Sequence, residues 1–157
     1  MPRILRYFVP KIVDCDICGC ACHVLTIAIK DSMIQVQSNL QVADNSGARR
    51  VQCIRILKKS KAISAGVGDI ITVVVKKARP HKRVQRKDIQ TAIIVRVKKD
   101  INRKDGFKLN LGENSCMLVN SAKDLTPLGT RLNGPVAIRE LRKAKAIKCI
   151  LLSNYNY

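Results

Sequence analysis

The sequence predicts a mainly β protein, a small barrel followed by short C-terminal α-helices. Short runs of β-branched or alternating apolar residues, separated by closely spaced turn signals, predict the barrel. After Gly134-Pro135 the apolar residues recur at helical spacing, which predicts the helices. Hydrophobic residues make up 46% of the 157 residues, so the chain can bury a core and its basic charge belongs to a folded protein.

The first predicted strands surround a polar turn. Apolar residues alternate with polar ones at 34–36 and again at 40–42, and a second apolar run follows at 51–57. Between them, residues 44–47 combine side chains that hydrogen-bond their own backbone with a glycine that tolerates positive φ. The turn leads into Arg49 and Arg50. Backbone N–H groups and guanidinium groups are therefore expected together, a combination that suits phosphate and sugar oxygens.

Glycine-containing turns bound the later strands. The turn at 66–69 precedes a β-branched run that is typical of a buried strand, and Lys104-Asp105-Gly106 predicts a hairpin turn. Four strands are predicted after the turn at 66–69, namely 70–75, 92–97, 107–111 and 116–119. The last of them is expected to end the β structure.

The C-terminal segment changes its hydrophobic period. Gly134-Pro135 is expected to stop the β pattern, and a proline suits the first turn of a helix. One or two short basic amphipathic helices should follow, because apolar and basic positions interleave at near-helical spacing. These positions are Leu141, Ala144, Ile147 and Leu151 on the apolar side and Arg142, Lys143, Lys145 and Lys148 on the basic side.

Charge divides the chain into two regions. The formal net charge is +19, of which residues 1–32 carry +1 and residues 33–157 carry +18. We therefore interpret 1–32 as an N-terminal extension and 33–157 as the main domain. The first 13 residues are basic and apolar, as in organelle-targeting segments, but the extension is expected to be retained and to dock on a neighbour.

The excess positive charge predicts a polyanionic partner. Three loops concentrate it, with candidate contacts at Lys58, Lys59, Lys61, Arg79, His81, Lys82, Arg83, Arg86, Lys98, Lys99 and Arg103. Nucleic acid is favoured over a merely solvated surface, and no apolar run approaches the roughly 20 residues of a membrane span. Aromatic residues are only 3% and there is no Trp, so contacts to backbone and shape are expected rather than base stacking.

A cysteine cluster in the extension is the strongest metal-binding signal. Its candidate ligands are Cys15, Cys18, Cys20, Cys22 and His23. A C-x-x-C pair followed by glycine is half of a zinc knuckle, whereas a full site normally draws its second pair from farther away. Zinc binding, iron–sulfur ligation, free thiols and disulfides are all compatible with this cluster. The rest of the sequence requires no cofactor.

The remaining chemistry-bearing residues favour a structural role. Cys53, Cys116 and Cys149 are isolated in apolar patterns and are expected to fill the core. The chain shows no Ser/His/Asp set, no paired carboxylates and no phosphate-cradling loop with lysine. An enzyme is therefore not expected.

Several motifs, in order and at characteristic spacing, resemble the L-fourteen family of universal large-subunit ribosomal proteins. The resemblance covers 33–157 and departs from the family by one extra residue, Ala137 or Ile138, before Arg139-Glu140-Leu141. The motifs are 39–50, 65–71, 92–96, Asp105-Gly106, Asn114, Cys116, Gly129-Thr130-Arg131, Gly134-Pro135-Val136 and 139–142.

The resemblance implies a five-stranded β-barrel with short C-terminal helices and no enzymatic activity. Members bind large-subunit rRNA, touch small-subunit rRNA in an intersubunit bridge and pack against neighbouring large-subunit proteins. In some systems a ribosome-silencing factor docks on them. The implied rRNA contacts are Asn45, Ser46, Arg49 and Arg50, and the implied rRNA- or protein-facing residues of the C-terminal side are Arg131, Arg139 and Arg142.

The extension suggests an organellar ribosome, with a mitochondrion as the first expectation and a plastid as the second. The alternative is a free regulatory RNA-binding factor with a zinc-knuckle arm. A metal-dependent enzyme is a third reading, for which Asp14 and Asp16 beside the cysteines are the only candidate bases.

Overall fold

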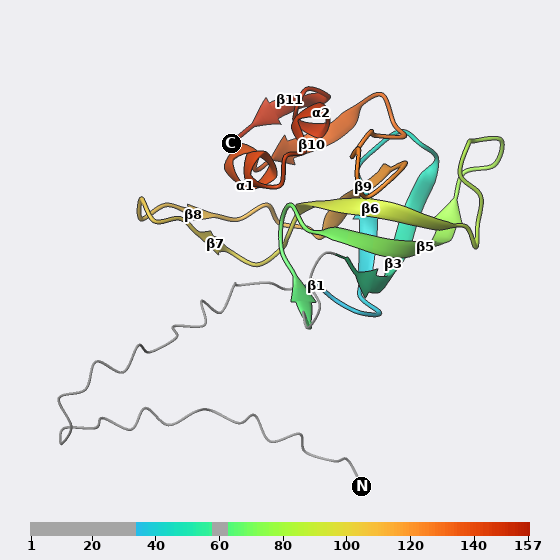
Figure 1. The fold of residues 1–157 in the computed structure, drawn as a ribbon, viewed down its shortest axis with the longest axis horizontal. Helices are drawn as coiled ribbons and strands as arrows, with labels where there is room; N and C mark the ends of the chain where they lie inside the picture. The colour runs from blue at the N-terminus through green and yellow to red at the C-terminus, as the bar shows by residue number, and fades with distance from the viewer. Residues whose placement is uncertain (1–33, 58–62) are drawn as a thin grey trace, which may run out of the picture.

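Five strands close into a barrel in the order β2-β3-β5-β6-β9. The structure, a computed structural model, describes residues 34–57 and 63–157. Neighbouring strands pair antiparallel except β2 and β9, whose parallel pairing closes the barrel. The strands are β2 (Asn39–Val42), β3 (Ala48–Ile56), β5 (Ile70–Ala78), β6 (Ile89–Arg96) and β9 (Ser115–Val119) (Figure 1). The predicted five-stranded barrel with short C-terminal helices is confirmed.

Two hydrophobic clusters explain why some strands read as continuous apolar runs. In β6, Ala92 and Ile94 face the barrel interior, whereas Ile93 and Val95 belong to a second cluster outside it. Strand β9 alternates in the same way between the two clusters. Because both faces of these strands are buried, both sets of alternating positions must be apolar.

The C-terminal segment covers the outside of β6 and β9. It consists of β10 (Leu132–Val136), α1 (Ile138–Lys143), α2 (Ile147–Ile150) and β11 (Ser153–Asn156). Leu141 of α1 and Cys149 of α2 are fully buried in the second cluster. Figure 1 shows these elements gathered above the barrel, with the C-terminus beside α1.

Two predictions about this segment were wrong. Strand β9 is not the last, because β10 and β11 follow and pair in parallel. Gly134-Pro135 does not stop the β structure either, since both residues lie within β10. The register shifts between Leu132 and Pro135, and Gly134 has φ +88, so the strand tolerates both residues at an irregularity. The short helices were predicted correctly and begin only at Ile138.

Two small strand pairs complete the fold. β1 (Ile34–Gln35) pairs with β4 (Ser64–Ala65), and β7 (Ile101–Asn102) pairs with β8 (Lys108–Leu109). The predicted hairpin turn lies between β7 and β8, although the strand after it is shorter than expected. Figure 1 shows this β7–β8 hairpin projecting from the barrel below α1.

Candidate nucleic-acid interface

The polar turn after β2 is fixed by a buried carboxylate. Asp44 Oδ1 accepts hydrogen bonds from the Ser46 backbone N–H at 3.0 Å and from the Ser46 hydroxyl. Its Oδ2 accepts the Leu118 backbone N–H at 3.0 Å. Asp44 and Ser46 are both buried. The turn is thus tied to β9 through hydrogen bonds to a charged acceptor, which are stronger than neutral ones.

The other side of the turn holds the loop at 129–131. The Asn45 side chain donates to Thr130 Oγ1 at 2.9 Å and accepts the Thr130 backbone N–H at 2.8 Å. Gly129 approaches the turn so closely that a Cβ there would lie 2.8 Å from the Cβ of Asp44. Asn45 and Ser46 were predicted to contact RNA, and the structure shows that both side chains organise the turn itself.

A β-bulge presents the two arginines after the turn. The register of β3 on β5 shifts on both sides of Arg50, between Ala48 and Val51. An extra residue at a bulge breaks the strict alternation of side chains. Arg49 and Arg50 are consequently both exposed, although they are consecutive in a strand.

The loop after β5 docks on the same turn. The Arg79 backbone N–H donates to the Gly47 carbonyl at 2.8 Å, and Gly47 has φ +117. A Cβ on Gly47 would overlap the side chain of Lys82. Val84, only 2% exposed, anchors the loop in the barrel core. The loop is therefore held against the turn by a hydrogen bond, a close backbone approach and a buried side chain.

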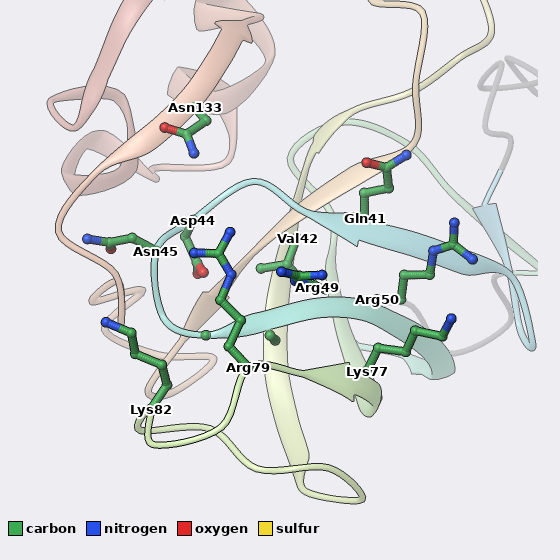
Figure 2. A pocket seen from close by; sticks show the side chains of 12 residues that line it. Gln41, Val42, Asp44, Asn45, Arg49, Arg50, Lys77, Arg79, Lys82 and Asn133 are labelled. Carbon is green, nitrogen blue, oxygen red and sulfur yellow. The ribbon is translucent and has the colours of Figure 1, made fainter.

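Together these segments form a groove of about 540 Å³, which we call the basic groove. Five cationic side chains line it: Arg49, Arg50, Lys77, Arg79 and Lys82. Figure 2 shows them arriving from β3, from β5 and from the loop after β5. Among the described residues, none of the five has a carboxylate partner. The one acid in the lining, Asp44, is committed to the turn. Such a surface is suited to a chain of phosphates.

Other predicted contacts lie outside the groove. His81, Arg83 and Arg86 are exposed on the loop after β5, and Lys98 and Lys99 are exposed after β6. Arg131 and Arg142 are exposed on the C-terminal side. Lys58, Lys59 and Lys61 fall outside the described residues, as do Cys15, Cys18, Cys20, Cys22 and His23.

Two of the predicted arginines form ion pairs with acidic residues of the same chain. Arg139 of α1 forms an ion pair and hydrogen bond with Asp105 in the hairpin turn. Arg103 pairs with Glu140 at 3.2 Å and also donates to the Tyr157 carbonyl at 3.3 Å. The Arg139 guanidinium lowers the pKa of Asp105 below its ordinary value of 3.8 through that hydrogen bond and its charge. We call this region the hairpin–helix contact.

The groove contains residues that were not among the predicted contacts. Gln41, Lys77 and Asn133 line it, and Asn133 comes from β10, far along the chain. Lys77 belongs to the basic run at 76–87, which the sequence already indicates as one of the three charged loops. Asn133 carried no sequence signal, because only the folding of β10 against the turn brings it there.

The three described cysteines fill the core, as predicted. Cys53, Cys116 and Cys149 are all buried. Burial raises the thiol pKa of Cys53 and Cys116, and that of Cys149 to about 11. Because the thiolate is the nucleophile and the metal ligand, these thiols are poorly suited to either role at neutral pH. Within residues 34–57 and 63–157, no group of three or more His, Cys, Asp or Glu is placed to hold a metal.

The fold and the groove define a class, that of small β-barrel proteins whose basic groove is suited to the backbone of a nucleic acid. In the described part of the chain, no helix has the length and apolar character needed to cross a membrane. The sequence model of the ribosomal protein L14p/L23e family matches residues 33–156. The chain belongs to this family, and it is therefore a structural constituent of the ribosome rather than an enzyme.

Proposed function

We propose that this protein is a structural constituent of the large ribosomal subunit whose basic groove binds the backbone of large-subunit rRNA. The observation that carries the proposal is the set of five groove cations without carboxylate partners among the described residues. The turn and the docked loop fix the backbone of these residues before RNA binds. Little backbone entropy then has to be lost on binding, and the remaining cost is the ordering of the side chains.

We propose that a second RNA contact, to small-subunit rRNA across the subunit interface, involves the β7–β8 hairpin and its flanks. Lys98, Lys99, Lys104 and Lys108 are exposed there. The hairpin projects from the barrel, whereas the groove is built from β3, β5 and the loop after β5 (Figures 1 and 2). Two separate basic regions are what a bridge between two RNA molecules requires. Arg103 and Arg139 are expected to contribute less to this contact, because each is already paired with a carboxylate of the same chain.

Neighbouring large-subunit proteins are the proposed partners of the C-terminal segment, and a ribosome-silencing factor is a further proposed partner of the protein. Large apolar side chains are exposed on α2, β11 and the residues beside them, namely Ile147, Leu151, Tyr155 and Tyr157. Exposed large apolar side chains within one short segment favour a protein partner. Aromatic residues in particular are enriched at such interfaces.

The proposed location is a mitochondrial ribosome, with a plastid ribosome as the alternative. The basis is the composition of the extension at 1–32, whose structure lies outside the described residues. Zinc or iron–sulfur binding by Cys15 and Cys18 with Cys20, Cys22 or His23 remains a prediction from sequence. Elemental analysis of the full-length protein, beside a C15S/C18S variant, would test it. Stoichiometric metal lost in the variant is expected if the cluster binds one.

Sedimentation tests the main proposal against the alternative of a free regulatory RNA-binding factor. Native lysate is fractionated on gradients at low and moderate salt, and the protein is quantified across each gradient. Comigration with the large subunit through the moderate-salt wash is expected. Recovery only in light fractions at both salt concentrations would contradict the proposal and favour the free factor.

A further inference from the structure

Asn133 stands at the edge of the basic groove with an uncommitted amide. Its side chain is exposed and is one of those that line the groove, reaching it from a separate strand (Figure 2). Neither the amide nitrogen nor the amide oxygen forms a hydrogen bond with any residue that the structure describes. An amide carries two N–H donors and an acceptor oxygen, so its full hydrogen-bonding capacity is available to a ligand.

The backbone of Asn133 is fixed from both sides. Its N–H donates to the Ala43 carbonyl at 2.8 Å, and its carbonyl accepts a hydrogen bond from Arg96 Nη1 at 2.6 Å. Arg96 is only 4% exposed, and its other terminal nitrogen pairs with Glu113 at 2.7 Å. The guanidinium of Arg96 also occupies the space where a Cβ on Gly134 would lie. The amide is thus presented from a rigid support, which lowers the entropic cost of binding through it.

The groove lining shows which part of a nucleotide the amide would meet. None of its twelve lining residues is aromatic. A base turned into the groove would therefore find no stacking platform there, whereas single-stranded bases are usually read on such platforms. If the five cations bind phosphates of the strand, the group next to each bound phosphate is a ribose. Its 2′-hydroxyl both donates and accepts hydrogen bonds, as an amide does.

We propose that Asn133 binds a ribose 2′-hydroxyl of the RNA strand whose phosphates lie in the basic groove. The cations then supply affinity that does not depend on the sugar, and Asn133 supplies the preference for RNA. This inference rests on the proposed function, because it requires RNA in the groove. It goes further by naming the residue that distinguishes RNA from a polyanion of the same charge.

The test compares two probes that differ only at the sugar. One is an RNA hairpin, and the other is the same hairpin with 2′-fluoro sugars, which keep the A-form shape but cannot donate a hydrogen bond. Affinities of the full-length protein are measured for both probes over a range of salt concentrations. The variants are N133L, which keeps the side-chain size and removes its polar atoms, and the control N120L, which makes the same change at an exposed residue outside the groove.

Wild type and N120L should prefer the RNA hairpin by roughly three- to ten-fold, the range expected for one hydrogen bond. N133L should bind both probes equally, with the same salt dependence as wild type, because no phosphate contact has changed. Thermal unfolding of N133L should match wild type, since its backbone hydrogen bonds are retained.

Two results would overturn the inference while leaving the proposed function intact. One is an N133L variant that keeps the wild-type preference, and the other is a wild-type protein that binds both probes equally. Failure of wild type to bind either hairpin at low salt would instead overturn the proposed function, and this inference with it.

Discussion

The basic groove and the hairpin–helix contact use arginine in opposite ways. In the groove, Arg49, Arg50 and Arg79 have no carboxylate partner among the described residues. In the hairpin–helix contact, Arg103 and Arg139 pair with Glu140 and Asp105. All five arginines were predicted from sequence to contact RNA, with a protein-facing role as the alternative for Arg139. The difference teaches that a cation's function depends on which acids the fold brings to it.

Internal pairing changes what an arginine can offer to RNA. A paired guanidinium must give up or share its carboxylate before it meets a phosphate, whereas an unpaired one exchanges only water and counterions. We therefore expect the groove to dominate RNA affinity and the hairpin–helix contact to contribute mainly to stability.

The largest effect is expected at Gly47, where the loop after β5 docks on the polar turn. Gly47→Ala should lower the free energy of unfolding by about 3 kcal/mol, because an alanine at φ +117 is strained and its Cβ displaces Lys82. Urea unfolding measures the loss. Gly106→Ala in the hairpin is the matched control, since φ is +83 there and nothing lies within 4 Å of the added Cβ. It should lose only about 1 kcal/mol, the cost of the backbone conformation alone. Equal losses would show that Lys82 does not constrain the groove.

Removing two groove charges is expected to weaken RNA binding more than removing two charges from the hairpin. R79Q/K82Q should reduce affinity for transcribed large-subunit rRNA by roughly 10- to 50-fold and lower the slope of its salt dependence by about two. The control K104Q/K108Q removes the same charge from exposed hairpin positions. If both variants lose affinity equally, net charge rather than the groove determines binding.

Breaking the covered ion pair should affect stability and leave RNA affinity unchanged. The side chains of Arg103 and Glu140 are only 16% and 15% exposed. A double-mutant cycle with R103Q and E140Q should give a coupling energy of roughly 1 to 2 kcal/mol in urea unfolding, less than for a fully buried pair. If E140Q binds RNA markedly more tightly than wild type, the pair with Glu140 prevents Arg103 from contacting RNA.

The smallest effect is expected at the exposed pair. Because Arg139 lowers the pKa of Asp105, the pair stabilises the folded state above the ordinary aspartate pKa of 3.8 and loses that contribution as the pH falls through the lowered value. NMR titration of the Asp105 carboxyl group should show its midpoint below 3.8 in wild type and nearer that value in R139Q. An identical midpoint in both proteins would exclude the pair in solution.

The sequence by itself determined the barrel strands and the burial of Cys53 and Cys116 within them. Alternation along β3 marks Val51 and Cys53 as core, and the fully apolar runs in β6 and β9 require burial on both faces. The helical period after residue 138 determined the short helices. These features follow from local spacing, so no knowledge of distant partners is needed to infer them.

Tertiary structure decided how the site is assembled. The bulge that exposes both Arg49 and Arg50 depends on the register of β3 against β5, and Asn133 reaches the groove only because β10 packs beside the turn. Strand β10 itself was missed, because Gly134 and Pro135 are tolerated only at its irregular register. The ion pairs of Arg103 with Glu140 and of Arg139 with Asp105 likewise depend on the packing of α1 against the hairpin. Each is a contact between residues distant in sequence, which local composition cannot specify.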